Sequence, residues 1–154
     1  MQHTIRDGRP TDLDAILALL PRLADFELPP HRQSEDLWHS DAMLIRAWSR
    51  GEAPSCRVKV AINPEDRLLG AAVASLRKEM LSGAPSAHLE VLVIHPSADG
   101  HGVGRDLLRD IEGAVQQEGA TSLTLHVFAN NVRARHVYDQ MGYAGEIMRY
   151  IRHF

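Results

Sequence analysis

The sequence predicts an α/β fold in which one mixed central sheet of six to seven strands is flanked by four helices. Two observations predict it. Apolar residues recur with the helical period in some segments and alternate with polar residues in others. The two kinds of segment follow the order β-α-α-β-β-β-α-β-α-β along the chain. The length of 154 residues suits one ordinary domain, so we expect residues 1–154 to form a single domain.

The first half of the chain predicts a strand and two helices. Residues 3–6 form a short strand, and Thr11 caps a helix that Pro21 kinks or splits. A proline-rich loop at 29–32 follows, and a second helix is expected at 34–48 because Ser and two acids stand at its start.

The middle of the chain changes to the period of strands. Residues 56–62 and 68–76 alternate around a turn at 63–66, which predicts an antiparallel hairpin. Residues 89–94 are apolar except for Glu90, which indicates a central strand buried on both faces. An acid in such a strand costs free energy unless it is paired, hydrated or functional.

The last third of the chain alternates between helix and strand. A glycine cluster at 100–104 leads into a helix that ends at Gly119. A strand follows at 121–128, then a helix at 130–141, and residues 147–154 are expected to form the final strand. The inward stripe of the first of these helices consists of Val103, Leu107, Leu108, Ile111, Ala114 and Val115.

The composition argues against several classes of protein. Lys and Arg number 17 against 20 Asp and Glu, and the net charge of −3 lacks the basic excess of a nucleic-acid-binding protein. The single cysteine, Cys56, excludes an internal disulfide or a thiolate zinc cluster. Neither a secretory leader nor an apolar run of about 20 residues is visible. We therefore expect a cytoplasmic protein that binds neither nucleic acid nor a membrane.

The succession of strand, glycine-rich loop and helix start presents backbone N–H groups to an anion. Gly100, Gly102 and Gly104 permit the close approach of a phosphate, although the same glycines would also serve merely to turn a strand into a helix. A P-loop does not fit, because Arg105 and Asp106 stand where Lys and Ser or Thr are required. The dinucleotide-binding fingerprint does not fit either, because the spacing is G-x-G-x-G.

Two blocks of sequence together resemble the GNAT acetyltransferase superfamily. The first block, similar to the acetyl-CoA loop of that family, is Leu89-Glu90-Val91-Leu92-Val93-Ile94-His95-Pro96 followed by Gly100-His101-Gly102-Val103-Gly104. The second, similar to the family's later motif, is Asn131-Val132-Arg133-Ala134 followed by Tyr138 and Gly142-Tyr143. Their order and spacing match the family over the whole chain. The resemblance implies a GNAT fold and an enzyme that moves an acetyl group from acetyl-CoA to a primary amine by direct transfer in a ternary complex.

The resemblance also implies which residues hold acetyl-CoA. They are Leu92, Val93, Ile94, Asp99, Gly100, His101, Gly102, Val103, Gly104, Arg105, Asn131, Arg133 and Tyr138. Asn131 would bond the pantetheine arm but is equally suited to cap a helix. Arg133 would meet the 3′-phosphate, unless it is simply solvated. No metal site is expected, since the histidines lack a ligand spacing.

Asp99 departs from the family pattern, which usually has Arg or Gln three residues before the middle glycine. A carboxylate that points at a pyrophosphate is repulsive. Two outcomes stay open: Asp99 turns outward and caps the following turn, which its residue type favours, or it weakens coenzyme binding. Arg105, or less directly His101, would supply the missing positive charge.

Tyr138 and Glu90 are the candidate catalytic residues. Tyr138 matches the family's tyrosine that faces the coenzyme sulfur, so its phenol would protonate the departing thiolate; the alternative is a core tyrosine. Glu90 matches an acid that acts as a base through water or binds a cationic acceptor. The alternative for Glu90 is a residue that faces outward or pairs within a hairpin.

The acceptor is expected to be a small-molecule amine. Residues 23–27 and 34–37 are faintly similar to the diamine acetyltransferase branch, and Phe26, Glu27 and Glu90 are expected to contact the substrate. Acids in these segments would attract a cationic amine. Two alternatives stay open, an acyl-CoA-binding regulator without turnover and an acetyltransferase for protein N-termini or lysines. A homodimer is common in this superfamily and is a further expectation.

Overall fold

The computed structural model describes residues 1–154, and its elements follow the predicted order as far as the last helix. The strands are β1 (Thr4–Asp7), β2 (Cys56–Ile62), β3 (Leu68–Lys78), β4 (Pro85–Ile94) and β5 (Leu123–Leu125). The α-helices are α1 (Leu13–Leu19), α2 (His39–Ser49), α3 (Val103–Gln117) and α4 (Val132–Gln140). Short 3-10 helices are η1 (Pro10–Asp12), η2 (Leu20–Ala24), η3 (Ser34–Leu37) and η4 (Pro96–Ala98).

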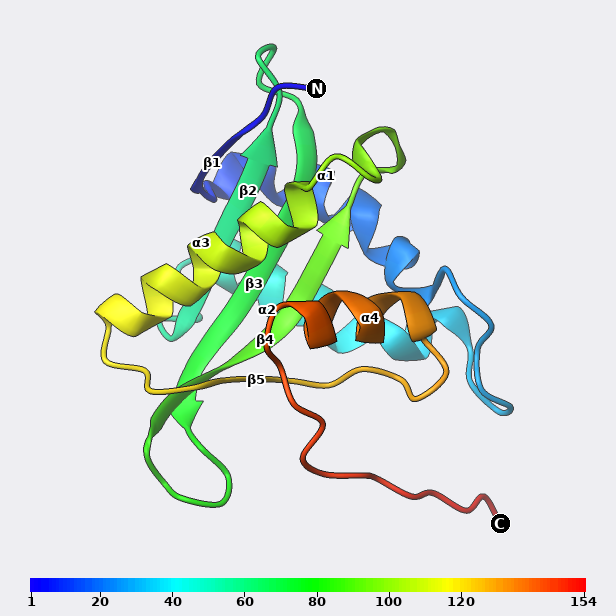
Figure 1. Cartoon of the computed structure of the whole chain (residues 1–154). Coiled ribbons are helices and arrows are strands. Elements are labelled where there is room, and N and C mark those ends of the chain that lie inside the picture. Colours follow the sequence, from blue (N-terminus) through cyan, green and yellow to red (C-terminus); the bar gives the residue numbers. More distant parts are fainter.

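The strands form one sheet in the order β1-β2-β3-β4-β5 (Figure 1). Neighbours from β1 to β4 pair antiparallel, whereas β5 runs parallel to β4. The direction changes because short loops join β2, β3 and β4, whereas α3 carries the chain back across the sheet before β5. The predicted mixed sheet is therefore confirmed.

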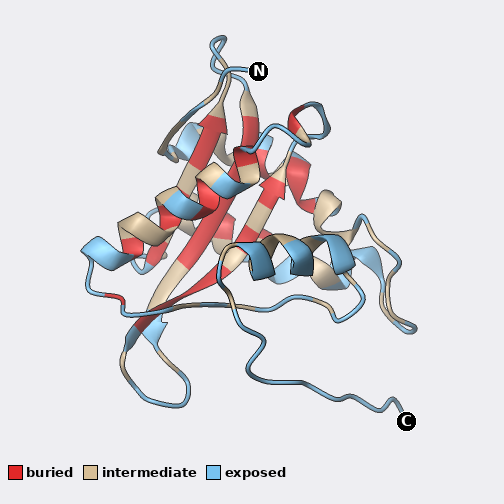
Figure 2. Ribbon diagram, in the orientation of Figure 1, coloured by how far each residue is buried: buried red, intermediate tan, exposed pale blue.

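Helices cover both faces of the sheet, and a core lies under each face (Figures 1 and 2). α3 packs over β2, β3 and β4 on one face. Its buried residues are Val103, Leu107, Leu108, Ile111 and Val115, which are five of the six residues of the predicted stripe, and the sixth, Ala114, is half-buried. On the other face, α1 and α2 bury Ile16, Leu19, Ala42 and Ile45. None of the helices combines the length and the apolar character that crossing a membrane requires.

The first helix breaks where proline predicts it. α1 ends at Leu19, and the chain continues as η2, whose first turn contains Pro21. The tighter turn brings Arg22 to the end of β4, where its Nε donates a hydrogen bond to the Ile94 carbonyl oxygen at 2.8 Å.

The predictions for the last strands are wrong in extent. The sheet has five strands rather than six to seven, because residues 147–154 form no strand and β5 covers only Leu123–Leu125 of the predicted 121–128. A strand needs a neighbour that satisfies its backbone groups. Residues 147–154 are exposed along their length (Figure 2), and near their end the His153 ring lies 4.7 Å from the His31 ring.

β4 contains a bulge at Glu90. Val91 lies opposite Val73 and Leu89 lies opposite the next residue, Ala74, so Glu90 has no partner on β3. The extra residue places Leu89 and Val91 on opposite faces of the sheet, although residues two apart in a regular strand share a face.

Beyond the bulge, β4 and β5 separate into a fork. β5 pairs with β4 only opposite Ala87, His88 and Leu89, whereas β4 continues to Ile94. His88 lies at the closed end of the fork, where its Nδ1 and the Thr124 hydroxyl are 2.7 Å apart. The edge of β4 after Leu89 therefore faces no strand.

Candidate active site

The fork opens into a cavity of about 220 Å³. One wall is formed by residues 89–92 of β4, and the other by residues 125–128, which continue from β5. The cavity is completed by side chains from η2, η3, α2 and α4. Elements far apart in the sequence thus meet at the fork between β4 and β5.

Glu90 reaches this cavity from the bulge of β4. The bulge explains how an acid fits into an otherwise apolar strand, because the extra residue escapes the regular alternation between the two buried faces. The Glu90 carboxylate has no hydrogen bond or ion pair with another side chain. A ligand in the cavity would therefore meet a free acceptor.

A second carboxyl group, that of Asp41, lines the same cavity from the first turn of α2. Burial and, after it, the neighbouring Glu90 raise the pKa of Asp41 from 3.8 to about 7. No cation of the protein pairs with Asp41. The sequence gives no signal that Asp41 belongs to the site, because an acid in the first turn of a helix is already explained by the helix dipole.

Tyr138 lines the cavity from α4. Its ring packs against Tyr143 in an edge-on arrangement with 5.8 Å between the centroids. Burial raises the pKa of Tyr138 to about 12, so the phenol stays protonated at neutral pH. Its hydroxyl makes no hydrogen bond within the protein, in contrast to the Tyr143 hydroxyl, which donates to Glu112 at 2.6 Å. Tyr138 is thus a free proton donor.

Two of the three glycines of the predicted loop have the expected conformation, whereas Gly104 lies in the first turn of α3 and faces the Ile94 side chain. Gly100 and Gly102 have φ angles of 77° and 78°, in the left-handed region, and a Cβ at either position would point into open space. Gly102 stands at the N-cap position, immediately before α3, and no side chain caps the helix. The first N–H groups of α3 are therefore available to an anion.

A model of the acetyltransferase (GNAT) family matches residues 20–143, which is most of the chain. The chain belongs to the GNAT acetyltransferase family. The enzymes of this family are acyltransferases that use acetyl-CoA, and the predicted superfamily and coenzyme are confirmed. The likeness to the diamine branch stays a prediction.

Solved structures share the GNAT fold at low sequence identity. A Pyrococcus furiosus protein assigned as an acetyl transferase is 20% identical with a TM-score of 0.81, and the match covers 99% of this chain and 100% of that one. The ribosomal-protein-alanine N-acetyltransferase of Brucella melitensis is 16% identical with a TM-score of 0.71, covering 99% and 100%. AAC(6')-Iy, solved with the bisubstrate analog CoA-S-monomethyl-acetylneamine, is 20% identical with a TM-score of 0.72, covering 100% of both chains. No curated protein sequence matches the chain.

The residues present fit acetyl-CoA. The free edge of β4 beyond Leu89 can pair with the amide groups of a pantetheine arm, as a strand would. The space around Gly100 and Gly102 and the start of α3 suit a pyrophosphate. In this GNAT protein the fork lies along the second half of β4, and the glycine loop follows the end of the same strand after η4. One extended ligand can therefore occupy both.

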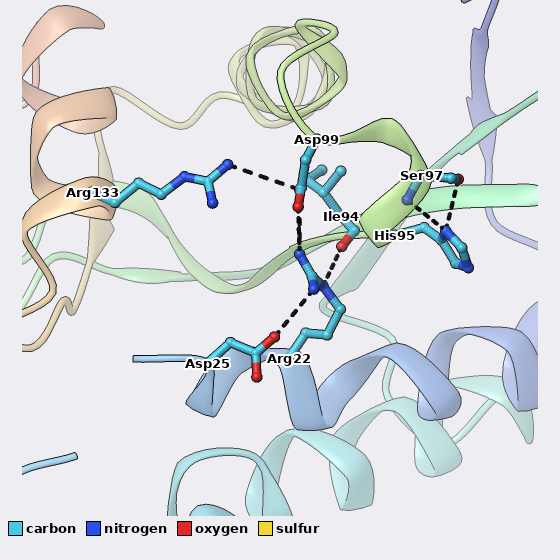
Figure 3. Close-up of polar contacts among 7 residues, drawn as sticks. All are labelled: Arg22, Asp25, Ile94, His95, Ser97, Asp99 and Arg133. Atoms are coloured by element: carbon cyan, nitrogen blue, oxygen red, sulfur yellow. Dashed lines mark hydrogen bonds and ion pairs between the residues drawn. The ribbon is translucent and has the colours of Figure 1, made fainter. Parts of the chain in front are cut away.

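Asp99, the departure from the family pattern, neither caps a turn nor stands unpaired (Figure 3). Arg22 Nη2 donates to both of its carboxylate oxygens, at 3.0 and 3.3 Å, and Arg133 Nη2 lies 3.9 Å from Oδ1. Arg22 also bonds Asp25 at 3.1 Å and the Ile94 carbonyl oxygen. The expectation of an outward, capping Asp99 is corrected: an arginine 77 residues away neutralises it.

Some of the other predicted site residues also line the cavity. Phe26, Leu92 and Asn131 line the cavity with Glu90 and Tyr138. Phe26 packs on Phe128 with 5.6 Å between the centroids, and Asn131 accepts a hydrogen bond from the Ala134 N–H as the cap of α4.

The remaining predicted residues lie outside the cavity. Val93 is buried in the core under α1 and α2, and Val103 under α3. His101 and Glu27 are exposed. Arg105 is exposed and is hydrogen-bonded to Gln140 at the end of α4.

Proposed function

We propose that residues 1–154 form one acetyltransferase domain, which transfers the acetyl group of acetyl-CoA directly to a primary amine in a ternary complex. One observation carries the proposal: a protonated, unpartnered phenol and two unpartnered carboxyl groups line a single cavity at the fork of the sheet. Acetyl-CoA supplies an activated acetyl group on a thioester.

The carboxyl groups of Glu90 and Asp41 bind the amine substrate. An alkylamine is protonated at neutral pH and must lose a proton before it attacks a carbonyl carbon. Glu90, on the bulge beside the free edge of β4, takes this proton, directly or through one water molecule. Asp41 adds a second acceptor on the α2 side, and Arg22, the arginine that lines the cavity, is already paired with Asp25 and Asp99.

Tyr138 completes the transfer on the coenzyme side. As the C–N bond forms and the C–S bond breaks, the phenol gives its proton to the sulfur. The second proton of the amine then returns the phenol to its neutral state. Backbone N–H groups on the free edge of β4, near Val93 and Ile94, would hold the carbonyl oxygen while negative charge develops on it.

A coupled assay tests the proposal. Thiol release from acetyl-CoA is followed with a panel of polyamines, arylalkylamines, aminoglycosides, amino sugars and peptides with a free N-terminus. We expect turnover with at least one small amine and intersecting double-reciprocal plots, as a ternary complex requires. Glu90→Gln is expected to lower kcat about a hundredfold at neutral pH. Its acetyl-CoA affinity should be unchanged.

Three results would contradict the proposal in different ways. Tight acetyl-CoA binding without turnover on any amine would make the protein an acyl-CoA-binding regulator. Turnover restricted to peptides would make it a protein acetyltransferase. Parallel double-reciprocal plots would replace direct transfer with a covalent intermediate.

A further inference from the structure

Two histidine side chains are in contact at the point where β4 and β5 separate (Figure 1). One is His88 of β4, and the other is His126, which directly follows β5. Their ring centroids lie 4.7 Å apart, and the ring planes are inclined by 57°. His88 is buried, whereas His126 is exposed and lines the cavity. An imidazole therefore reaches the same cavity as the candidate base Glu90.

His126 lies on the face of the sheet from which α2 covers the cavity. Leu89 belongs to the core under α3, so its neighbour His88 points to the opposite face. Thr124, which is paired with His88 in the ladder, shares that face, and so does His126, two residues further on. Asp41 reaches the cavity from α2, which packs on this same face. The imidazole thus lies on the acceptor side of the cavity, where the amine is expected.

Glu90 and His126 occupy corresponding positions on the two walls of the cavity. The last pair of the parallel ladder is Leu89 opposite Leu125, so the next residue is Glu90 on one strand and His126 on the other. The ladder ends there, and both side chains line the cavity. Neither side chain makes a hydrogen bond or an ion pair within the protein. A carboxylate and an imidazole, both unpartnered, therefore flank the closed end of the fork.

His88 holds the His126 ring in this position and does not compete with it for a proton. Its Nδ1 lies 2.7 Å from the Thr124 hydroxyl, which fixes the ring of His88 against β5. Burial, and after it the charges of Arg77 and His126, lower the pKa of His88 to about 4. The His88 ring is therefore neutral at neutral pH. A neutral ring in contact with His126 leaves that imidazole free to take up a positive charge.

We infer that His126 relays the proton of the amine from Glu90 to the solvent during acetyl transfer. The inference rests on the proposed function and adds a route for the proton that Glu90 removes. In the first step an N–H bond of the ammonium group breaks and an O–H bond forms on Glu90. In the second step a ring nitrogen of His126 takes that proton, directly or through one water molecule, and the other ring nitrogen releases a proton to water. Because His126 acts through Glu90, it is a positioning residue and not a catalytic one.

The other ionisable side chains at the cavity do not provide this route. Arg22 is always protonated and is paired with Asp25, and Tyr138 holds its proton at neutral pH. Asp41 is the competitor, because its pKa of about 7 suits a relay. Asp41 is half-buried whereas His126 is exposed, so the imidazole has the better access to solvent.

Chemical rescue tests the relay in the full chain, with acetyl-CoA and the amine that is turned over fastest. His126→Gln should lower kcat about tenfold at about pH 7 and leave the KM for acetyl-CoA unchanged. Added imidazole should restore kcat in proportion to its concentration, because the free base replaces the missing ring. The parent enzyme should not respond to imidazole. His136→Gln is the matched control and should behave as the parent, since His136 is exposed on α4 but does not line the cavity.

The outcomes separate the relay from the proposed function. A parent chain that turns over no amine overturns both. Turnover by the parent with an equal kcat in His126→Gln overturns the relay alone. A loss of kcat that imidazole does not restore would make His126 a structural residue, and this result also overturns the relay. Rescue of Asp41→Asn instead of His126→Gln would move the relay to α2 and overturn the assignment to His126.

Discussion

Two clusters of polar groups lie close to the fork, and they differ in how their charges are paired. In the loop cluster (Arg22, Asp25, Asp99 and Arg133) each carboxylate has a guanidinium partner, and Arg22 also holds a backbone carbonyl. In the cavity cluster (Asp41, Glu90 and Tyr138) no polar group has a partner within the protein. The central pair of the loop cluster, Arg22 and Asp99, is half-buried like the three residues of the cavity cluster, so exposure does not explain the contrast between them.

The difference separates structural from functional polar groups. A partly buried charge that is paired fixes neighbouring elements, as Arg22 fixes η2 to the end of β4. A partly buried polar group without a partner carries a desolvation cost that the fold does not recover. Such a cost is tolerated where a ligand provides the missing partner, so the cavity cluster is where substrates are expected to act.

The largest expected effect comes from removing the proton donor of the cavity cluster. Tyr138→Phe retains the ring packing against Tyr143 but has no proton for the sulfur. We expect kcat to fall by about a hundredfold or more, with little change in the KM for acetyl-CoA. Steady-state kinetics measures this, and Tyr143→Phe, which loses only the bond to Glu112, is the matched control. Equal losses in both variants would refute a specific role for Tyr138.

An intermediate effect is expected from separating the pair in the loop cluster. Arg22→Gln leaves the Asp99 carboxylate near the glycine loop without its main partner, and acetyl-CoA affinity should fall about five- to tenfold. Adding Asp99→Asn should recover most of the loss. Calorimetric titration with acetyl-CoA measures both variants.

The single variant Asp99→Arg gives the complementary test. Because Arg22 already neutralises Asp99, installing the family's usual arginine should bring no gain in affinity, and the new charge beside Arg22 should lower the Tm. A large gain would show that Asp99 repels the coenzyme in spite of its partner.

The smallest effect is on stability, and it depends on pH. Folding raises the pKa of Asp41 from 3.8 to about 7, so the folded protein favours the neutral form of this carboxyl group. The contribution of Asp41 to the free energy of unfolding is therefore fully present below about pH 4 and is lost as the pH rises through about 7. Asp41→Asn, which stays neutral, should stabilise the protein at about pH 8 by roughly 1–2 kcal/mol after allowance for partial exposure, and hardly at all at about pH 4.

Thermal unfolding at the two pH values measures this difference, and Asp36→Asn is a control with an exposed acid. In the enzyme assay, the same Asp41→Asn variant should lose the dependence of acceptor KM on pH near 7. A variant less stable than the parent at high pH would contradict the account of Asp41.

Local patterns in the sequence determined much of this protein. The stripe of α3, the break at Pro21, the left-handed glycines before α3 and the family itself follow from residues close together in the chain. These features depend on helical period, on the missing N–H of proline and on the freedom of glycine, which act within a few residues.

Only the tertiary structure decided which groups meet. The bulge at Glu90 depends on register with β3, and Asp41 joins Glu90 because α2 packs on that face of the sheet. Asp99 appeared repulsive in the sequence because its partner, Arg22, lies 77 residues away. The sequence likewise predicted a strand at 147–154 but supplied no neighbour for it. Charge pairing and strand pairing act between elements distant in sequence, so no local pattern encodes them.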